Sequence, residues 1–513
     1  MFHFSSPEST RPASFHLIIL ATILGLVLVF HHFFLKFPFG FPFVIFILAY
    51  LAGLHLLLVL NKSLINRWAY IFLIPVAASL FGEIMYASEA TRALAFCLTA
   101  VSLALFTFWI SATAQTFAHL KRLWPMRIVK ETIFPFPALR TFKPVASSSL
   151  STKHLEQLFL GLAVALPFLI VLFALFVSAD QFFSSTITSW LKIENFPQHL
   201  GLYFVDTCFG IFLLAYLWTA LRRKDTPQEE STAEATPFQE HLAANTFLIL
   251  INALFLLFIA FQFVYLFGGE NYVRAQNIVY AEYGRNGFFQ LLAVSAIVFG
   301  ITWAVYWITH QERPLTRWLN ALLIAQTAII MISATKRLWL YVDVYGLTLS
   351  RWWGFAGILL IAIALLLCLI CIARQCPFAK LVRNITFVSL AFLSIMVVLN
   401  NESLITRFNI HRTVTEGVAL DSKYLLFQLS SDALTPFATF FYQSGEQAEI
   451  ILRRPVQATP TDNRYGNDKF LEGGDMTSYL KQKRSDLLSL YDQSWRNLVI
   501  SDYRALMTLE AGK

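Results

Sequence analysis

Four acidic residues stand where predicted apolar segments end, at positions from which a carboxylate can act at a membrane surface. They are Glu83, Asp180, Glu282 and Asp343. A carboxylate there can serve as a general base or hold a divalent cation. Charges also mark the ends of ordinary membrane helices, because long or charged side chains reach for water. The four residues are therefore candidate catalytic residues, and no particular reaction follows from them.

A second group of charges lies inside apolar runs. Asp206 interrupts the run LGLYFVDTCFGIFLLAY, and Lys336 and Arg337 stand near the end of another run, at a similar depth. A charge facing lipid costs roughly 2.5 kcal/mol or more at the centre of the bilayer, and less near its surface. We therefore expect a structural ion pair in which Asp206 binds Arg337 or Lys336.

The stretch from Gly268 to Gln290 separates two apolar runs and is too polar to cross a membrane. Its acidic and basic residues are spaced by three or four, and its aromatic residues follow one helical face. This pattern predicts an interfacial helix over residues 269–286 that leads into the next span. The residues that form it are Glu270, Arg274, Tyr280, Glu282, Tyr283 and Arg285.

The cysteines form no recognisable site. Cys368 and Cys371 make a CxxC pattern inside an apolar run, where cysteine behaves as a small hydrophobic residue, and Cys376 follows in a short loop. The chain has no GxSxG, HExxH or Walker A motif, and no His/Cys cluster with zinc spacing in a polar segment. We expect no metal, no cofactor and no disulfide framework, although an enzyme without these motifs is not excluded.

The composition is that of a membrane protein. Of 513 residues 57% are hydrophobic and only 14% charged, with a mean hydropathy of +0.60. Runs of about 20 apolar residues recur, which is the length of a membrane-spanning helix and too long for a barrel strand. We predict an all-α polytopic protein of about eleven transmembrane helices in the lipid bilayer. The predicted spans are 15–35, 41–60, 68–87, 93–115, 158–179, 200–221, 244–268, 287–309, 319–341, 352–373 and 385–400.

The basic residues indicate orientation rather than nucleic-acid binding. The net charge is +8, and much of the excess lies in short loops between spans. With a cytoplasmic N-terminus, the inner segments carry more than twice as many Lys and Arg residues as the outer loops. An odd number of spans then predicts an extracytoplasmic C-terminus.

The chain divides into segments of different character. In the tail, Asp421 is predicted to cap a helix through Leu429, and Asp432 another that runs toward Tyr442. The predicted segments are a four-helix part (1–115), a basic amphipathic cytoplasmic loop (116–157), two spans (158–221), a flexible cytoplasmic linker (222–241), a five-helix part (242–400) and a helical extracytoplasmic domain (401–513).

Five segments occur in an order typical of one family: ALPFLIVLFALFVSADQFF, LFIAFQFVYLFGG, YAEYGRNGFFQLLAV, KRLWLYVDVYGLTLSR and RFNIHR…LDSKYLLFQLSSDALTPF. The chain resembles an uncharacterised bacterial membrane family of the DUF4173/DUF4153 type, a domain of unknown function. The resemblance covers roughly Leu155 to Phe437 and leaves the first four predicted helices outside. It implies a multi-pass protein of the bacterial cytoplasmic (inner) membrane, and it implies no activity or catalytic residue.

These observations favour a non-enzymatic scaffold, sensor or accessory subunit with membrane or envelope protein partners. The alternative is a transferase acting on a lipid-linked envelope substrate at the outer leaflet. A transporter is a third hypothesis, weakened because no paired broken helices occur in matching halves. A deep cavity that gathers two of the candidate carboxylates would favour the enzyme, and a closed outer surface the scaffold.

Overall fold

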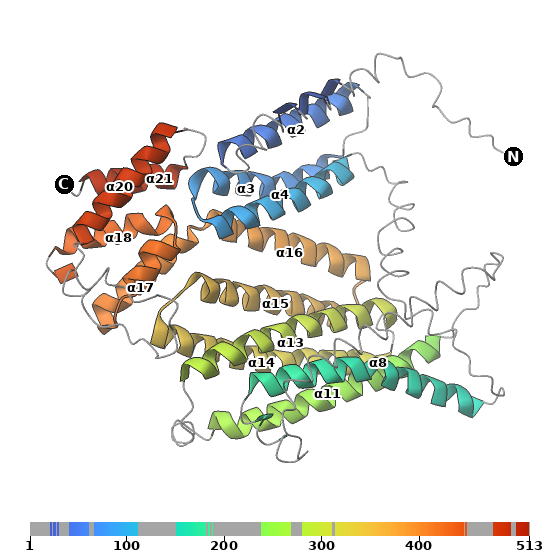
Figure 1. Cartoon of the computed structure of the whole chain (residues 1–513). Helices are drawn as coiled ribbons and strands as arrows, with labels where there is room; N and C mark the ends of the chain where they lie inside the picture. Colours follow the sequence, from blue (N-terminus) through green and yellow to red (C-terminus); the bar gives the residue numbers. More distant parts are fainter. Residues whose placement is uncertain are drawn as a thin grey trace. The chain divides into compact units, whose positions relative to one another are not determined.

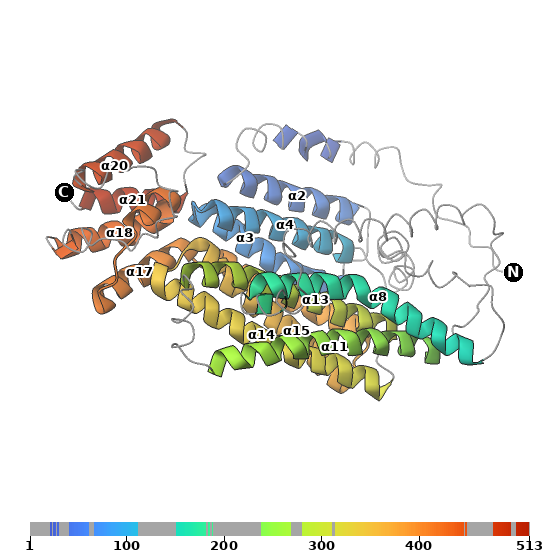
Figure 2. The same cartoon turned by 60° about the horizontal axis from the view of Figure 1, so that its bottom comes forward.

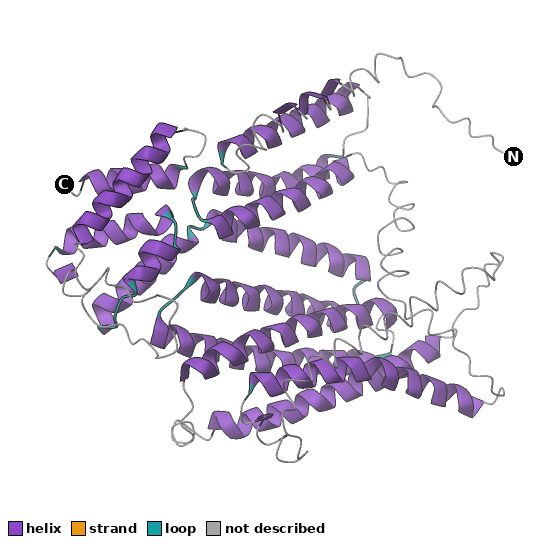
Figure 3. Ribbon diagram, in the orientation of Figure 1, coloured by secondary structure: helices purple, strands orange, loops and turns teal. Residues whose placement is uncertain are grey.

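The computed structural model of the chain is helical in every element it describes, and no strand occurs among those residues (Figure 3). The described residues are 21–22, 24–26, 28–29, 40–60, 66–110, 150–180, 183–184, 187, 237–267, 280–309, 313–445, 447–448, 476–493 and 499–511.

Among the described residues, nine helical segments are long and apolar enough to cross a membrane. They correspond to nine of the eleven predicted spans, and the all-α polytopic class is confirmed. Of the other two, the span 200–221 lies outside the described residues. The first, 15–35, is described only in part, and its described residues are helical. A Cβ added to Gly53 would lie 3.0 Å from Cγ2 of Thr22, so this helix packs against the next one.

The chain forms two compact units, which are described separately here. The central unit comprises Leu120–Val388. Its helices are α8 (Leu150–Ala179), α11 (Pro237–Phe267), α13 (Tyr280–Thr309), α14 (Pro314–Tyr345), α15 (Leu349–Arg374) and the first part of α16 (Phe378–Val398) (Figure 1).

Phenylalanine fills the core of the central unit. α8, α11, α13 and α14 pack side by side (Figure 2). The rings of Phe176 and Phe258 stack at 3.9 Å between centroids, and Phe183 meets Phe258 edge-on at 5.4 Å. Aromatic pairs of this kind add to the packing of a bundle, where lipid supplies little hydrophobic drive between helices.

The terminal unit joins both ends of the chain, Met1–His119 and Ser389–Lys513. Its membrane part contains α2 (Phe41–Leu60), the 3₁₀ turn η3 (Arg67–Phe72), α3 (Leu73–Met85), α4 (Glu89–Ile110) and the end of α16. A Cβ on Gly82 would approach Cγ1 of Val397 to 2.5 Å, so α3 and α16 touch through the missing side chain. Close helix contact at a small residue is common in membranes.

The tail of the terminal unit is helical. It contains α17 (Asn401–Glu416), the π-helical turn η5 (Tyr424–Gln428), α18 (Ser431–Ser444), α20 (Met476–Gln493) and α21 (Ile500–Ala511). Asp421 accepts the backbone N–H of Tyr424 at 3.0 Å, so the predicted cap there is present. The predicted cap at Asp432 is wrong, because Ser430 caps α18 and the Asp432 side chain points elsewhere.

Several predicted segments fall largely outside the described residues. They include most of the basic loop 116–157 and the linker 222–241, whose last residues belong to α8 and α11 respectively. The segment 269–286 is described only from Tyr280, where α13 begins. The predicted domain boundaries stay predictions.

Candidate functional sites

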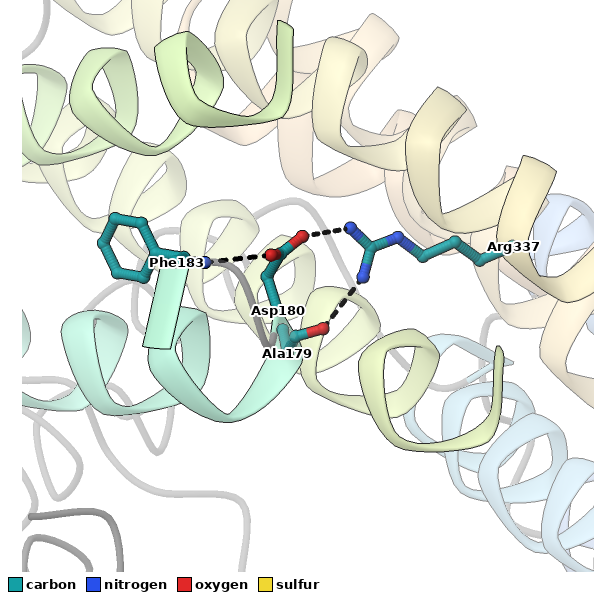
Figure 4. A network of polar contacts seen from close by, with 4 residues as sticks. All are labelled: Ala179, Asp180, Phe183 and Arg337. Atoms are coloured by element: carbon teal, nitrogen blue, oxygen red, sulfur yellow. Dashed lines mark hydrogen bonds and ion pairs between the residues drawn. The ribbon is translucent and has the colours of Figure 1, made fainter. Parts of the chain in front are cut away.

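A buried ion pair closes one end of the central bundle. Nη2 of Arg337 on α14 lies 2.7 Å from Oδ2 of Asp180, which follows the last residue of α8. Nη1 of the same guanidinium donates to the carbonyl of Ala179 at 2.8 Å, and the other carboxylate oxygen accepts the N–H of Phe183 at 3.1 Å (Figure 4). Both charged residues are 3% exposed. The guanidinium therefore satisfies the charge of Asp180 and one carbonyl left over where α8 ends.

Gly287 on α13 makes room for this pair. A Cβ at position 287 would lie 2.5 Å from both the carbonyl oxygen of Ala179 and Nη1 of Arg337. Three helices thus meet at one point, where a glycine lets the backbone of α13 approach the ion pair. Asp180, Gly287 and Arg337 come from three different segments among the five that carry the family resemblance.

Arg337, which we expected to pair with Asp206, has Asp180 as its described partner. Lys336 is exposed while its neighbour Arg337 is buried, because successive helical residues point about 100° apart. Asp206 lies outside the described residues, so its own pairing stays a prediction.

Glu83 near the end of α3 is also buried. It is 0% exposed, and one of its oxygens accepts the N–H of Gly40 at 3.1 Å, just before α2 begins. The other carboxyl oxygen has no hydrogen-bond partner among the residues that the structure describes. Glu83 belongs to the terminal unit and Asp180 to the central unit. Each of these candidate bases therefore accepts hydrogen bonds from the fold around it.

The other candidate residues are less enclosed or lie outside the description. Asp343 on α14 is exposed. Glu282, with Tyr280, Tyr283 and Arg285, belongs to the first turns of α13. Glu270 and Arg274 lie outside the described residues.

Another buried carboxylate, Asp432, holds the tail helices on the membrane part of the terminal unit. Oδ2 of Asp432 accepts the backbone N–H groups of Ala87 and Ser88, both at 2.9 Å. These two residues form the turn between α3 and α4, so the first turn of α18 is held on the membrane hairpin. Two N–H donors on one charged oxygen make a strong, charge-assisted contact.

Two more carboxylates surround the start of α18. Glu402 on α17 accepts from both the N–H and the hydroxyl of Ser430, at 2.6 and 2.7 Å. Asp502 on α21 accepts from the hydroxyl of Ser431. We call Glu402, Ser430, Ser431, Asp432 and Asp502 the tail carboxylate cluster.

The tail carboxylate cluster gathers three acidic groups that repel one another. Burial raises the pKa of Glu402 above its ordinary value, and hydrogen bonds from Ser430 oppose the shift only in part. Burial likewise raises the pKa of Asp502, against the hydrogen bond from Ser431. Asp432 contributes a further negative charge to both sites. The three carboxyls therefore repel one another while their hydrogen bonds hold the helices together.

Within the part of the chain that is described, no group of three or more His, Cys, Asp or Glu residues has the arrangement of a metal site. Neither Gly287 nor Glu402 stands out in the sequence. A glycine inside an apolar helix and an acid in the first turn of a polar one are both common.

These features define an all-α polytopic membrane protein with buried charges at its helix ends. A family profile described as Domain of unknown function (DUF4153) matches residues 43–439, and the chain belongs to that family. The match begins at α2, so our expectation that the first four predicted helices lie outside the family is wrong for all but the first of them. Searches of curated proteins and of solved structures give no match.

Proposed function

We propose that the protein is a non-enzymatic scaffold or accessory subunit of the bacterial envelope, and that its tail helices present a surface to a membrane or envelope protein partner. One observation carries the proposal: the buried carboxylates serve the fold. Asp180 binds Arg337, and Asp432 holds the α3–α4 turn. A carboxylate used as a general base must instead reach a substrate proton.

The tail helices supply the surface that this function requires. On α21, Tyr503 and Met507 are spaced by one helical turn and are 49% and 48% exposed. Phe427 in η5 is 53% exposed. Exposed aromatic and methionine side chains are enriched at the centres of protein interfaces. The basic segment 116–157 is a second proposed contact, with the anionic inner leaflet.

The proposal is tested by complementing a deletion strain and profiling its lipids and envelope polymers. We expect Glu282→Gln and Asp343→Asn to restore the wild-type envelope in full. The double change Tyr503→Ser with Met507→Ser should insert in normal amount and fail to complement. Leu404→Ser on α17, another exposed apolar residue of the tail, is the matched control.

The outcome that overturns the proposal is chemical. A lipid or polymer modification that disappears in the deletion strain, and stays absent with Glu282→Gln or Asp343→Asn, would establish the transferase instead. Full complementation by the Tyr503 and Met507 double variant would remove the proposed partner surface.

A further inference from the structure

The end of α15 brings two cysteines together that are not the CxxC pair of the sequence. α15 ends at Arg374, and the next residue, Gln375, has the left-handed backbone with φ 50°. The N–H of Cys376 donates to the carbonyl of Cys371 at 3.0 Å, and the N–H of Gln375 donates to that of Ile372 at 3.4 Å. This pair of bonds is the Schellman motif.

The Schellman motif places the side chains of its first and last residues against each other, usually as a hydrophobic contact. Here those two residues are Cys371 and Cys376, and their side chains lie close enough to interact. A disulfide requires two cysteines whose backbones are adjacent and whose Cβ atoms face each other. The motif brings the two cysteines together at the end of α15.

The neighbours of the two thiols reinforce the arrangement. The hydroxyl of Tyr306 on α13 donates to the carbonyls of both Cys371 and Cys376. The Tyr306 ring lies 6.3 Å from that of Phe378, which starts α16. Arg374 and Lys380, the basic residues on either side of this turn, lie near the Cys371 thiol.

Solvent exposure distinguishes Cys376 from Cys371 and Cys368. Cys376 is partly exposed, whereas Cys371 is 2% and Cys368 0% exposed. A reagent from solution can therefore reach Cys376, and Cys371 is then in position to resolve the product. Cys368 lies one turn deeper on α15 and is out of reach.

We propose that Cys371 and Cys376 form a redox-active dithiol that takes a low-molecular-weight disulfide of the glutathione class as its oxidant. The Cys376 thiolate attacks one sulfur of the oxidant, which forms a mixed disulfide and expels one thiolate. The Cys371 thiolate attacks the Cys376 sulfur, which forms the Cys371–Cys376 disulfide and expels the second. The two protons of the protein thiols end on the two released thiols, so atoms and electrons balance.

The disulfide fixes the turn that connects α15 to α16. Two thiols are sufficient for a disulfide. Among the described residues, no group of three His, Cys, Asp or Glu side chains has the arrangement that a metal site would need. The predicted orientation places this turn at the cytoplasmic face, where thiols are normally reduced and a disulfide forms under oxidative stress.

The test uses purified full-length protein in detergent, equilibrated in buffers of oxidised and reduced glutathione. After an acid quench, free thiols are labelled with a maleimide polymer, and non-reduced digests are examined by mass spectrometry. We expect wild type to lose two labelled thiols and to yield a linked Cys371–Cys376 peptide two hydrogens lighter than the reduced form. Cys371→Ser and Cys376→Ser should each abolish that peptide, and the matched control Cys368→Ser should retain it.

A soluble peptide with one free cysteine, added to the same buffer, reports whether the oxidant is active. If that peptide becomes glutathionylated while Cys371 and Cys376 both stay free, the proposal is overturned. A linked peptide that joins Cys371 to Cys368, or either cysteine to Cys208, would overturn it as well. Phenylarsine oxide, which bridges adjacent thiols with loss of water, should protect the pair from labelling in wild type and not in Cys376→Ser.

Discussion

The guanidinium of Arg337 is buried because it makes three contacts at the point where three helices meet. It binds a charge, caps a carbonyl, and fills the space that Gly287 leaves open. An arginine is suited to this, since its planar fork offers several donors in fixed directions. Removing either charge leaves the other in an apolar bundle without its counter-charge.

We expect Asp180→Asn and Arg337→Gln each to lower the stability of the protein in detergent, because breaking a buried pair typically costs about 3–5 kcal/mol. The double variant should recover part of that loss. Thermal unfolding monitored by size-exclusion fluorescence measures the cycle. Lys336→Gln, on the exposed side of the same turn, is the matched control and should behave as wild type. Strictly additive losses would contradict a direct pairing.

A single methyl group at Gly287 should be damaging. The new Cβ of Gly287→Ala would lie 2.5 Å from the carbonyl oxygen of Ala179 and from Nη1 of Arg337, so one of them must move. Overpacking of this kind costs about 1–3 kcal/mol. Gly300→Ala on the same helix has no atom within 4 Å of its new Cβ and is the control. Equal thermal stability of the two variants would refute the close approach.

The sequence predicts a buried ion pair for Arg337 with Asp206 as its partner, and it does not single out Asp180, the described partner. Hydropathy gives the depth of a residue in a span, since depth follows residue number. It does not give the direction in which neighbouring helices lie. Asp180 stands at a helix end, where a solvated carboxylate is the ordinary interpretation. Likewise, CxxC spacing drew attention to Cys368, whereas the turn geometry selects Cys376.

At the scale of elements, α18 is joined to the α3–α4 hairpin by a side chain that would ordinarily cap its own helix. Asp432 stands in the first turn of α18, where sequence rules place a capping acid. Ser430 performs the capping, and this leaves the carboxylate available for Ala87 and Ser88. Local sequence rules predict that an acid at this position accepts a backbone N–H. They cannot predict that the N–H belongs to a residue more than three hundred positions away.

We expect Asp432→Ala to loosen the tail from the hairpin without unfolding the membrane helices. Two N–H groups of the α3–α4 turn would lose their acceptor, and a buried donor left unsatisfied costs about 1–3 kcal/mol. Hydrogen exchange should rise in α18 and in the turn, while α13 and α14 stay protected. Asp486→Ala on the exposed face of α20 is the control. Unchanged exchange in α18 would show that this anchor does not hold the tail.

The tail carboxylate cluster should make stability depend on pH. The pKa values of Glu402 and Asp502 are raised by burial. An acid with a raised folded-state pKa destabilises the fold while it is ionised, and this cost is relieved as the pH falls through the folded pKa. The tail should therefore resist proteolysis better at mildly acidic than at neutral pH.

The double variant Glu402→Gln with Asp502→Asn should remove most of this pH difference, and Glu416→Gln, half-exposed at the end of α17, should leave it in place. Protease half-lives are compared with those of an unfolded substrate at each pH. A tail that becomes less resistant on acidification would contradict the sign of the prediction.

At the scale of the whole molecule, the Asp180–Arg337 contact constrains how the chain threads the membrane. The ends of α8 and α14 and the start of α13 meet at one face of the bilayer. The segment between α11 and α13 is twelve residues long and polar, too short and too polar to cross as a helix, so α11 ends at that face too. Both α8 and α11 therefore run toward the same face.

Residue 180 and the start of α11 accordingly lie at opposite faces, as a span at the predicted position 200–221 would require. From there α11, α13, α14, α15 and α16 make five crossings, and the tail emerges opposite residue 226. The excess of basic residues predicts that residue 226 lies in the cytoplasm and the tail outside. The hydropathy of the sequence predicts the number of spans. The ion pair adds a test of whether an odd or an even number of spans separates two positions in the chain.

Alkaline phosphatase fusions after Ser184, Thr226 and Lys513 test this threading. The enzyme folds only outside the cytoplasm, so we expect activity after Ser184, none after Thr226 and activity after Lys513. Cytoplasmic-type fluorescent fusions at the same positions should give the opposite pattern and control for expression. Equal activity after Ser184 and Thr226 would rule out the crossing between α8 and α11. The inverse pattern at all three positions would keep the crossing and reverse the orientation, because parity rests on the ion pair and orientation on the loop charges.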